Sequence, residues 1–359
     1  MVGLHATDSA SVFLQARARM TESSPEGLEL AMYEERSVMR LLAMRRTLFL
    51  VPLADVPTVF AAASRAIGAI ERRRTISMLA EAGVGADPAA HLEKLDEVGL
   101  AAVRQREEAP TAVLTRSDPR LAERIGIARG KTYEGSISLG SRVFLQLAVD
   151  GRIGRGRPLG TWIGSQFRWS PIERWFPGGI PEIDVDEARA ELVRRWLRAF
   201  GPGTRDDIRW WTGWTVGATR QAVASINAVE VDLDDGELGY LLPDDCEPVV
   251  APAPWVTLLP ALDATTMGWK SRAWYLGPHR AALFDTNGNA GPTVWVDGHI
   301  VGGWAQRKTG EVVPRLLEDV GAEIRHAIDA EAARLEAWIG PTRVSASFPT
   351  PMEVDLRRG

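Results

Sequence analysis

The stretch Gly151-Arg152-Ile153-Gly154-Arg155-Gly156-Arg157-Pro158-Leu159-Gly160 constrains the fold of this chain most strongly. It follows a predicted helix, Ser138 to Asp150, and strand-forming residues, Thr161 to Ile163, come after it. A helix that ends in a Gly/Arg-rich turn flanked by strand formers is typical of a helix-turn-helix unit with a wing. The alternative is a simple exposed hairpin turn.

The same pattern recurs after this segment. An amphipathic helix and two shorter helices are predicted, and Asp234-Asp235-Gly236 then predicts the turn of a hairpin. This second wing is acidic, so it is a weaker candidate for contact with phosphates. The predicted elements are helices Asp184 to Phe200, Thr204 to Thr212 and Thr215 to Ser225, and strands Val229 to Leu233 and Leu238 to Leu242.

The segments before the Gly/Arg-rich stretch are mostly helical by pattern. Asp87-Pro88 predicts a helix start, with Asp as the cap and Pro in the first turn, and Asp8 predicts another. One strand, Thr47 to Val51, interrupts the helices. The predicted helices run from Asp8 to Met20, Gly27 to Leu42, Thr58 to Ile70, Thr75 to Ala82, Asp87 to Gln105, Thr111 to Arg116 and Pro119 to Ile125.

From Pro252 onward the pattern changes to strands. Asp297-Gly298 lies between two apolar runs and is a strong hairpin signal. The tail therefore predicts a small β barrel or sheet with one covering helix. Its predicted strands are Trp255 to Leu259, Ala281 to Phe284, Thr293 to Val296, His299 to Gly303 and Arg343 to Phe348, and its helix is Ile324 to Ile339.

The composition is that of a globular protein with several packed units. The chain has 359 residues, of which 45% are hydrophobic and 25% charged. A net charge of -5 argues against a protein that coats nucleic acid nonspecifically, but it permits a local basic face. Only four of the 42 basic residues are lysines. Arginine can form two parallel hydrogen bonds with a phosphate, so this excess of arginine over lysine suits DNA binding. The codon bias of a GC-rich genome produces the same excess.

Several classes of protein are not supported. A single cysteine, Cys246, cannot form an internal disulfide, and without a Cys/His cluster the sequence offers no metal site. No phosphate-binding glycine loop of the nucleotide-binding type is present, so we expect no nucleotide or other cofactor. The longest apolar stretches, such as Val143 to Val149, are too short to span a bilayer. We therefore expect a cytoplasmic protein with no membrane partner.

Five sequence blocks, taken in order, resemble the AlkZ-like DNA glycosylases, a family of tandem winged-helix proteins. The first block begins only two residues into the chain, so we expect either an abridged first domain or a misassigned start. The blocks are Gly3-Leu4-His5-Ala6-Thr7, Met44-Arg45-Arg46-Thr47-Leu48, Leu197-Arg198-Ala199-Phe200-Gly201-Pro202, Leu258-Leu259-Pro260-Ala261-Leu262-Asp263 and Val296-Asp297-Gly298-His299-Ile300-Val301-Gly302-Gly303-Trp304.

The resemblance implies an α+β fold in which tandem winged-helix (helix-turn-helix) domains precede a small C-terminal β-barrel-like domain. The corresponding division of this chain is an abridged first winged helix with linking helices in residues 1–86, a second in 87–180, a third in 181–249 and the β-rich domain in 250–359. In the family these units line a positively charged channel around double-stranded DNA. We expect a monomer.

The resemblance also implies a chemistry, the hydrolysis of the N-glycosidic bond of alkylated purines. A cationic alkylpurine is already a good leaving group, so an amide that places a water can suffice, without the two carboxyl groups of ordinary glycoside hydrolysis. Characterised members carry Gln and Gln, or Gln and Asp, at the two polar positions of the first block. Here these positions are His5 and Thr7. A neutral imidazole could hold the water or act as a base, since its unperturbed pKa lies near neutrality.

Basic residues give the candidate DNA contacts, because counterion release supplies most sequence-independent affinity for DNA. Each has an alternative role as part of a solvated surface. The run Arg72-Arg73-Arg74 is a weaker candidate of the same kind. The candidates are Arg45 and Arg46 in the first domain, Arg152, Arg155 and Arg157 in the Gly/Arg-rich stretch, and Lys270 and Arg272 near the fourth block.

Two other functions remain open at this point. The chain could be a noncatalytic DNA-binding module, transcriptional or damage-sensing, that has lost the catalytic amide pair. It could also have turned from DNA to protein partners, which the acidic wing of the third winged helix and the negative net charge would suit.

Overall fold

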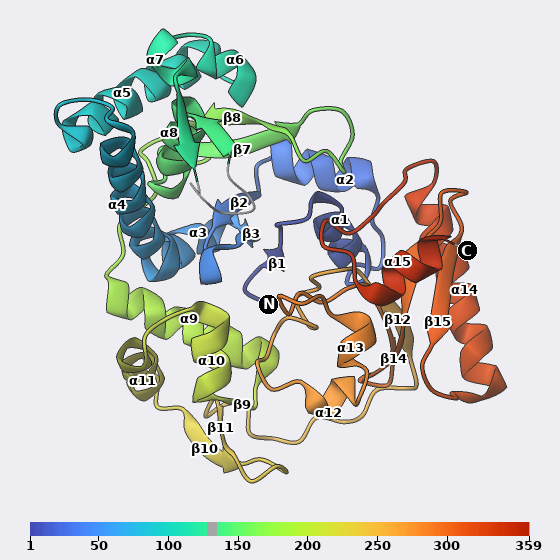
Figure 1. Cartoon of the computed structure of the whole chain (residues 1–359). Helices are drawn as coiled ribbons and strands as arrows, with labels where there is room; N and C mark the ends of the chain where they lie inside the picture. Colours follow the sequence, from blue (N-terminus) through green and yellow to red (C-terminus); the bar gives the residue numbers. More distant parts are fainter. Residues whose placement is uncertain (128–134, 359) are drawn as a thin grey trace. The chain divides into compact units, whose positions relative to one another are not determined.

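A computed structural model describes residues 1–127 and 135–358 (Figure 1). The chain is a mixed α/β protein of helices and several small antiparallel sheets. Its internal contacts divide it into two compact units. The first consists of Met1–Leu28 together with Val193–Gly359, and the second of Glu29–Leu192.

Three helices form the core of the second unit: α4 (Arg65–Ala82), α5 (Pro88–Arg106) and α8 (Leu139–Val149). The predicted start of α5 is confirmed, because the Asp87 side chain accepts hydrogen bonds from the N–H groups of Ala89 and Ala90. Gly99 lets α5 and α8 approach closely, since a Cβ there would lie 2.7 Å from Val143 Cγ1. Between them the helices bury a continuous cluster of leucine, valine and phenylalanine side chains.

One long helical segment, Leu53 to Ala82, replaces the two helices predicted at Thr58 to Ile70 and Thr75 to Ala82. It consists of a 3₁₀ turn (Leu53–Asp55), α3 (Val56–Val59), a π turn (Phe60–Ser64) and α4. Among the described residues it is the one helix long and apolar enough to cross a membrane by length and composition. However, 61% of its apolar window is buried inside the protein, which is typical of a core helix.

The Gly/Arg-rich stretch forms a strand rather than a turn. It supplies β7 (Ile153–Pro158), which pairs antiparallel with β8 (Phe167–Pro171), and β4 (Ala109–Pro110) pairs with the other edge of β8. The strand formers Thr161 to Ile163 lie in the connection between β7 and β8. The helix predicted before this stretch is confirmed as α8, with Ser138 as its cap.

The predicted helix Gly27 to Leu42 is wrong in its second half. Helix α2 (Pro25–Glu29) and a π turn (Leu30–Glu34) precede β2 (Val38–Leu42), which pairs along its whole length with β3 (Leu48–Pro52). The predicted helix Pro119 to Ile125 ends early, at α7 (Pro119–Ala122), because the next residues form a hairpin. Its strands are β5 (Arg124–Ile127) and β6 (Gly135–Ser138). The helix predicted at Thr111 to Arg116 is confirmed as α6 (Thr111–Thr115).

The first unit contains the predicted helix α1 (Ser9–Arg17), the second half of α9 (Val185–Phe200), and the two helices and the hairpin that follow α9. Thr204 and Asp207 form a reciprocal capping box at the start of α10, and Thr215 caps α11. The predicted hairpin is also present. Its elements are α10 (Arg205–Thr212), α11 (Val216–Ser225), β10 (Val229–Asp232) and β11 (Leu238–Leu241), with β9 (Gly203–Thr204) beside β11.

The tail is a four-stranded antiparallel meander in the order β12-β13-β14-β15, and α14 (Gly321–Ile339) packs against β12 and β15. The predicted strand Ala281 to Phe284 is wrong, since those residues form the short helix α13 (Arg280–Leu283) shortly after α12 (Ala273–Leu276). The last helix, α15 (Pro351–Arg358), was not predicted. The strands are β12 (Val256–Leu259), β13 (Thr293–Val296), β14 (His299–Gln306) and β15 (Val312–Leu316).

The predicted strand Arg343 to Phe348 is also wrong, and side chains explain why. Its backbone N–H groups donate to side-chain oxygens rather than to a neighbouring strand. Val344 donates to Gln306 Oε1 at 2.8 Å, Ala346 to Glu353 Oε1 at 3.1 Å and Ser347 to Asp8 Oδ2 at 2.8 Å.

Candidate functional site

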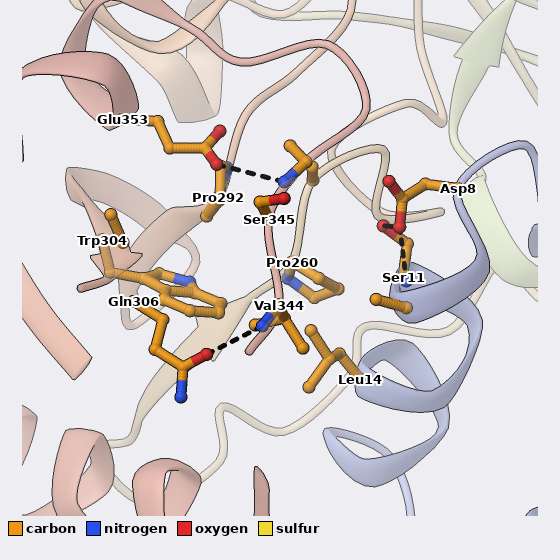
Figure 2. Close-up of a pocket in the computed structure, with 14 residues that line it drawn as sticks. Asp8, Ser11, Leu14, Pro260, Pro292, Trp304, Gln306, Val344, Ser345 and Glu353 are labelled. Carbon is orange, nitrogen blue, oxygen red and sulfur yellow. Dashed lines mark hydrogen bonds between the residues drawn. The ribbon is translucent and has the colours of Figure 1, made fainter. Parts of the chain in front are cut away.

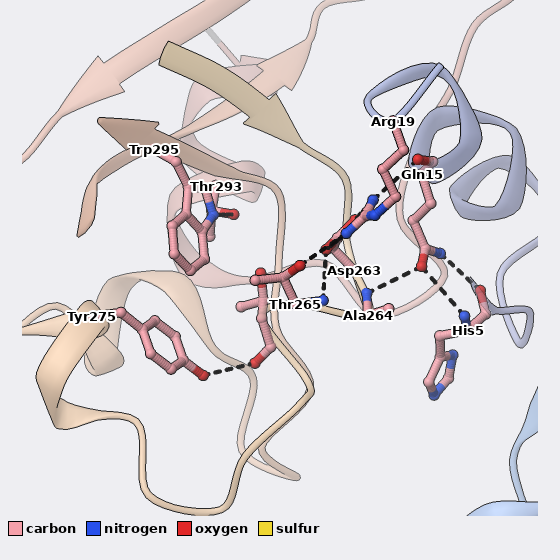
Figure 3. A network of polar contacts seen from close by, with 10 residues as sticks. His5, Gln15, Arg19, Asp263, Ala264, Thr265, Tyr275, Thr293 and Trp295 are labelled. Carbon is pink, nitrogen blue, oxygen red and sulfur yellow. Dashed lines mark hydrogen bonds and ion pairs between the residues drawn. The ribbon is translucent and has the colours of Figure 1, made fainter. Parts of the chain in front are cut away.

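His5 ends the short strand β1 (Leu4–His5), and its backbone is held by the Gln15 side chain (Figure 3). Gln15 Nε2 donates to the His5 carbonyl at 2.9 Å, and Gln15 Oε1 accepts from the His5 N–H at 3.3 Å. The same oxygen accepts from the Ala264 N–H at 3.1 Å. Both ends of this buried amide are thus committed to backbone groups, so the Gln15 side chain is not available to position a water molecule.

The two candidate catalytic side chains differ in exposure. His5 is 5% exposed, and Figure 3 shows its ring pointing away from Gln15. Thr7 is exposed and lies just before Asp8, the cap of α1. The structure therefore buries one candidate and exposes the other.

An ion pair next to this network fixes the loop after β12. Arg19 donates two parallel hydrogen bonds to Asp263, at 2.7 and 2.8 Å, and a third to Thr265 Oγ1 at 2.9 Å (Figure 3). Asp263 is completely buried. The bidentate geometry compensates for the cost of burying the carboxylate and keeps Ala264 in place to bind Gln15.

A small cavity lies beside α1, between Asp8, Pro260, Trp304, Gln306 and Glu353 (Figure 2). Its volume of about 20 Å³ suits a single water molecule. Burial raises the pKa of Glu353, whose carboxylate accepts from the Ala346 N–H. The cavity is far too small for a nucleobase, so it is not a substrate pocket.

In the second unit, Arg45 and Arg46 form the turn between β2 and β3. Both have left-handed backbones, with φ of 54° and 60°. Arg46 Nη2 lies 2.5 Å from a carboxylate oxygen of Glu71, which is 2% exposed on α4. Ser64 also donates to the carbonyl of Leu42 at 2.7 Å, so the hairpin is tied to the long helical segment at two points.

The three arginines of the Gly/Arg-rich stretch have different surroundings. Arg152 is exposed. The guanidinium of Arg155 lies 3.9 Å from the ring centroid of Phe167, and burial, together with the nearby Arg40, lowers its pKa to about 9. Arg157 pairs with Glu29 at 3.2 Å and with Glu34 at 2.9 Å. Only Arg152 of the three presents a side chain that is largely exposed.

Lys270 and Arg272, also predicted to contact DNA, lie before α12 in the first unit. Lys270 is exposed and pairs with Asp206 at 2.8 Å. Arg272 is 6% exposed; its Nε donates to the Trp269 carbonyl, and its guanidinium lies 4.7 Å from the Trp210 ring centroid. Burial lowers the pKa of Arg272. This packing indicates that Arg272 holds the loop in place, and the structure offers no exposed face of it for a phosphate.

The model of the family described as DNA glycosylase AlkZ-like matches residues 1–338. The chain belongs to the AlkZ-like DNA glycosylase family. Its structure is similar to that of Streptomyces sahachiroi DNA glycosylase AlkZ, with a TM-score of 0.71 over 95% of this chain and 90% of that chain. The sequences are 20% identical, so this likeness concerns the fold. A search of the curated protein sequences gives no match.

Several residues that organise this AlkZ-like chain were not found from the sequence. Gln15, Asp263 and Glu71 each act through partners distant in the sequence, which no local pattern reveals. A hollow of about 360 Å³ was missed too, although the basic residues around it were visible. It is lined by residues of α10, α11, β11 and the turn before β11, including Arg205, Arg209, Arg220, Asp206 and Glu237.

Within the described part of this AlkZ-like chain, His, Cys, Asp and Glu side chains form no group of three or more that could hold a metal ion.

Proposed function

We propose that this protein is a monofunctional DNA glycosylase that hydrolyses the N-glycosidic bond of alkylated purines in double-stranded DNA. The family match over residues 1–338 carries the proposal. The contacts of Gln15 support it, because the Gln15 side chain binds both backbone hydrogen-bonding groups of His5, the first of the two polar positions, in the short strand β1. A site fixed in this way loses little free energy in organising itself for reaction.

His5 and Thr7 are the proposed catalytic residues. The imidazole of His5 holds or deprotonates the attacking water, and the Thr7 hydroxyl gives that water a second hydrogen-bond partner. Departure of a cationic alkylpurine needs no general acid, so the protein has to place one water and stabilise the positive charge that develops on the sugar. The target base is reached by base flipping or by direct access to an exposed lesion.

The order of the elements along the chain suits tandem winged-helix domains followed by a β-rich domain. In residues 87–180, helices precede the hairpin β7–β8; in 181–249, α9, α10 and α11 precede the hairpin β10–β11. We assign these as the second and third winged helices, residues 1–86 as the first, and 250–359 as the β-rich domain. Arg45, Arg46, Arg152, Arg155, Arg157 and Lys270 are the proposed contacts to DNA, by a monomer in the cytoplasm.

The second candidate function is a noncatalytic DNA-binding module. The burial of His5 favours it, because a side chain 5% exposed is a poor base for a water that has to reach a sugar on DNA. The absence of the family's amide pair at His5 and Thr7 favours it as well.

Release of 7-methylguanine from a duplex that carries this base distinguishes the two candidates. A glycosylase releases the base, and His5→Ala lowers the rate on the order of 100-fold, as loss of a general base does. The double variant His5→Gln/Thr7→Gln restores the amide pair of characterised relatives and is expected to retain release. Salt-sensitive binding of the duplex without release, by the wild-type protein and by the double variant, would support the module instead.

A further inference from the structure

Glu71 is the centre of an arginine cluster in the second unit. Arg46 Nη2 and Arg74 Nη1 contact the same oxygen, Oε1, at 2.5 and 3.3 Å. Arg142 Nη2 contacts the other oxygen, Oε2, at 3.1 Å and is held in turn by Thr75 Oγ1 at 2.8 Å. One buried carboxylate therefore gathers three guanidinium groups from the β2–β3 turn, α4 and α8.

The charges in this cluster do not balance. Three arginines surround one carboxylate, which leaves an excess of two positive charges. Arg46 and Arg74 have side chains 45% and 56% exposed, whereas Arg142 is largely covered at 16%. Two neighbouring guanidinium groups thus turn one edge toward Glu71 and still reach solvent, which is the arrangement that suits a phosphate group.

The turn that carries Arg46 is held in an uncommon backbone conformation. Positive φ at two consecutive non-glycine residues, Arg45 and Arg46, costs free energy and persists only where the surroundings over-determine it. The contact of Arg46 with Glu71 and the bond from Thr47 Oγ1 to the Met44 carbonyl, at 2.9 Å, supply that constraint. Strain of this kind concentrates at binding sites.

We propose that Arg46 and Arg74 form a binding site for one phosphodiester group of the DNA backbone, and that Glu71 is the positioning residue that organises it. The proposal rests on the DNA-binding function proposed above and adds to it a specific pair of residues from two distant segments. Glu71 does not touch the phosphate. It fixes the two guanidinium groups side by side, so that little side-chain entropy is lost when the phosphate binds.

The test is the salt dependence of binding to an undamaged duplex by the full-length protein. Removing one phosphate contact weakens binding to all sequences and reduces the slope of log K against log[salt] by about 0.9. Arg46→Ala and Arg74→Ala are each expected to lower the affinity about tenfold and to reduce the slope by this amount. Arg106→Ala is the matched control: it removes the same charge from the last turn of α5 in the same unit, where an exposed arginine has no ion pair among the described residues.

Glu71→Gln distinguishes a positioning role of Glu71 from an effect of net charge, because the two predict opposite changes in the affinity for DNA. It removes a negative charge, so net charge alone predicts tighter binding to DNA. A positioning role predicts weaker binding, because Arg46 and Arg74 lose the group that holds them. If Glu71→Gln fails to fold, the two surface variants still decide the question.

The outcomes separate the site from the function. A wild-type protein that binds no duplex overturns the DNA-binding function, and the site with it. If the wild-type protein binds and Arg46→Ala and Arg74→Ala behave like Arg106→Ala, the site alone is overturned. A folded Glu71→Gln that binds more tightly overturns it as well.

Discussion

The side chain of Gln15 binds both hydrogen-bonding groups of the His5 backbone, at 2.9 and 3.3 Å. Gln15 is completely buried in α1, and the same amide oxygen also accepts from Ala264 at 3.1 Å. One glutamine thus ties the strand with the proposed catalytic histidine to a helix and to the loop after β12.

Gln15→Leu should therefore be strongly destabilising. The replacement is close in size but leaves three backbone groups without their partner, and each buried unsatisfied group costs on the order of 1 kcal/mol or more. We expect the free energy of unfolding in urea to fall by about 3 kcal/mol. A loss below about 0.5 kcal/mol would mean that these bonds contribute little to holding β1.

Asp263→Asn should destabilise the protein far more than Asp355→Asn. Asp263 is completely buried and receives two hydrogen bonds from Arg19, so its neutralisation leaves a guanidinium without its charge partner; removing one partner of a buried pair costs about 3 kcal/mol. Asp355 pairs with Arg315 at the surface, where ion pairs contribute little. Equal shifts of the thermal unfolding midpoint would contradict this ranking.

Asp96 should make the stability depend on pH in the mildly acidic range. Burial raises the pKa of Asp96 from 3.8 to about 6, although Arg72 at 2.8 Å pulls it down. The folded state then binds the proton more tightly than the unfolded chain, so this contribution to stability is lost as the pH rises from about 4 to about 6.

Urea unfolding at several pH values between 4.5 and 7 tests this expectation. Asp96→Asn should flatten the decline. Asp118→Asn serves as the control, because Arg120 holds the pKa of Asp118 at about 2, below this range. A decline of the same slope in Asp96→Asn and in the wild type would show that other groups cause it.

Gly302→Ala should be poorly tolerated in β14. A Cβ at Gly302 would lie 2.2 Å from the backbone carbonyl oxygen of Arg315 in β15, so the strands would have to move apart. Overpacking of this kind costs about 1 to 3 kcal/mol. Gly217→Ala in α11, where a Cβ meets nothing within 4 Å, is the control and should be neutral or stabilising. Similar melting temperatures for the two variants would refute the steric argument.

Local signals in the sequence predicted the elements that depend on local interactions. Asp87, Thr204 and Thr215 each mark a helix start, because the side chain of each accepts a hydrogen bond from the first turn of the helix that follows it. For Val38 to Leu42, the same local reasoning wrongly predicted a helix. These residues form a strand because β3 pairs with them, and pairing across a hairpin outweighs local helical periodicity.

The tail shows a different limit. Nothing local predicts that the N–H groups of Val344, Ala346 and Ser347 donate to side chains from three other segments. The segment therefore has an irregular structure, although its apolar pattern is typical of a strand. The candidate site has the same character. His5 and the Arg45–Arg46 turn were recognised by resemblance, whereas Gln15 and Glu71, which hold them, act over distances that the sequence does not show.

The measurement that tests the central claim most directly is single-turnover release of 7-methylguanine, with protein in excess over a duplex that carries one such base and an otherwise identical duplex with guanine. We predict time-dependent release from the alkylated duplex, an equal yield of abasic sites, loss of release in His5→Ala and none from the guanine duplex. A protein that binds the alkylated duplex and releases no base above the spontaneous rate would contradict the assignment as a glycosylase.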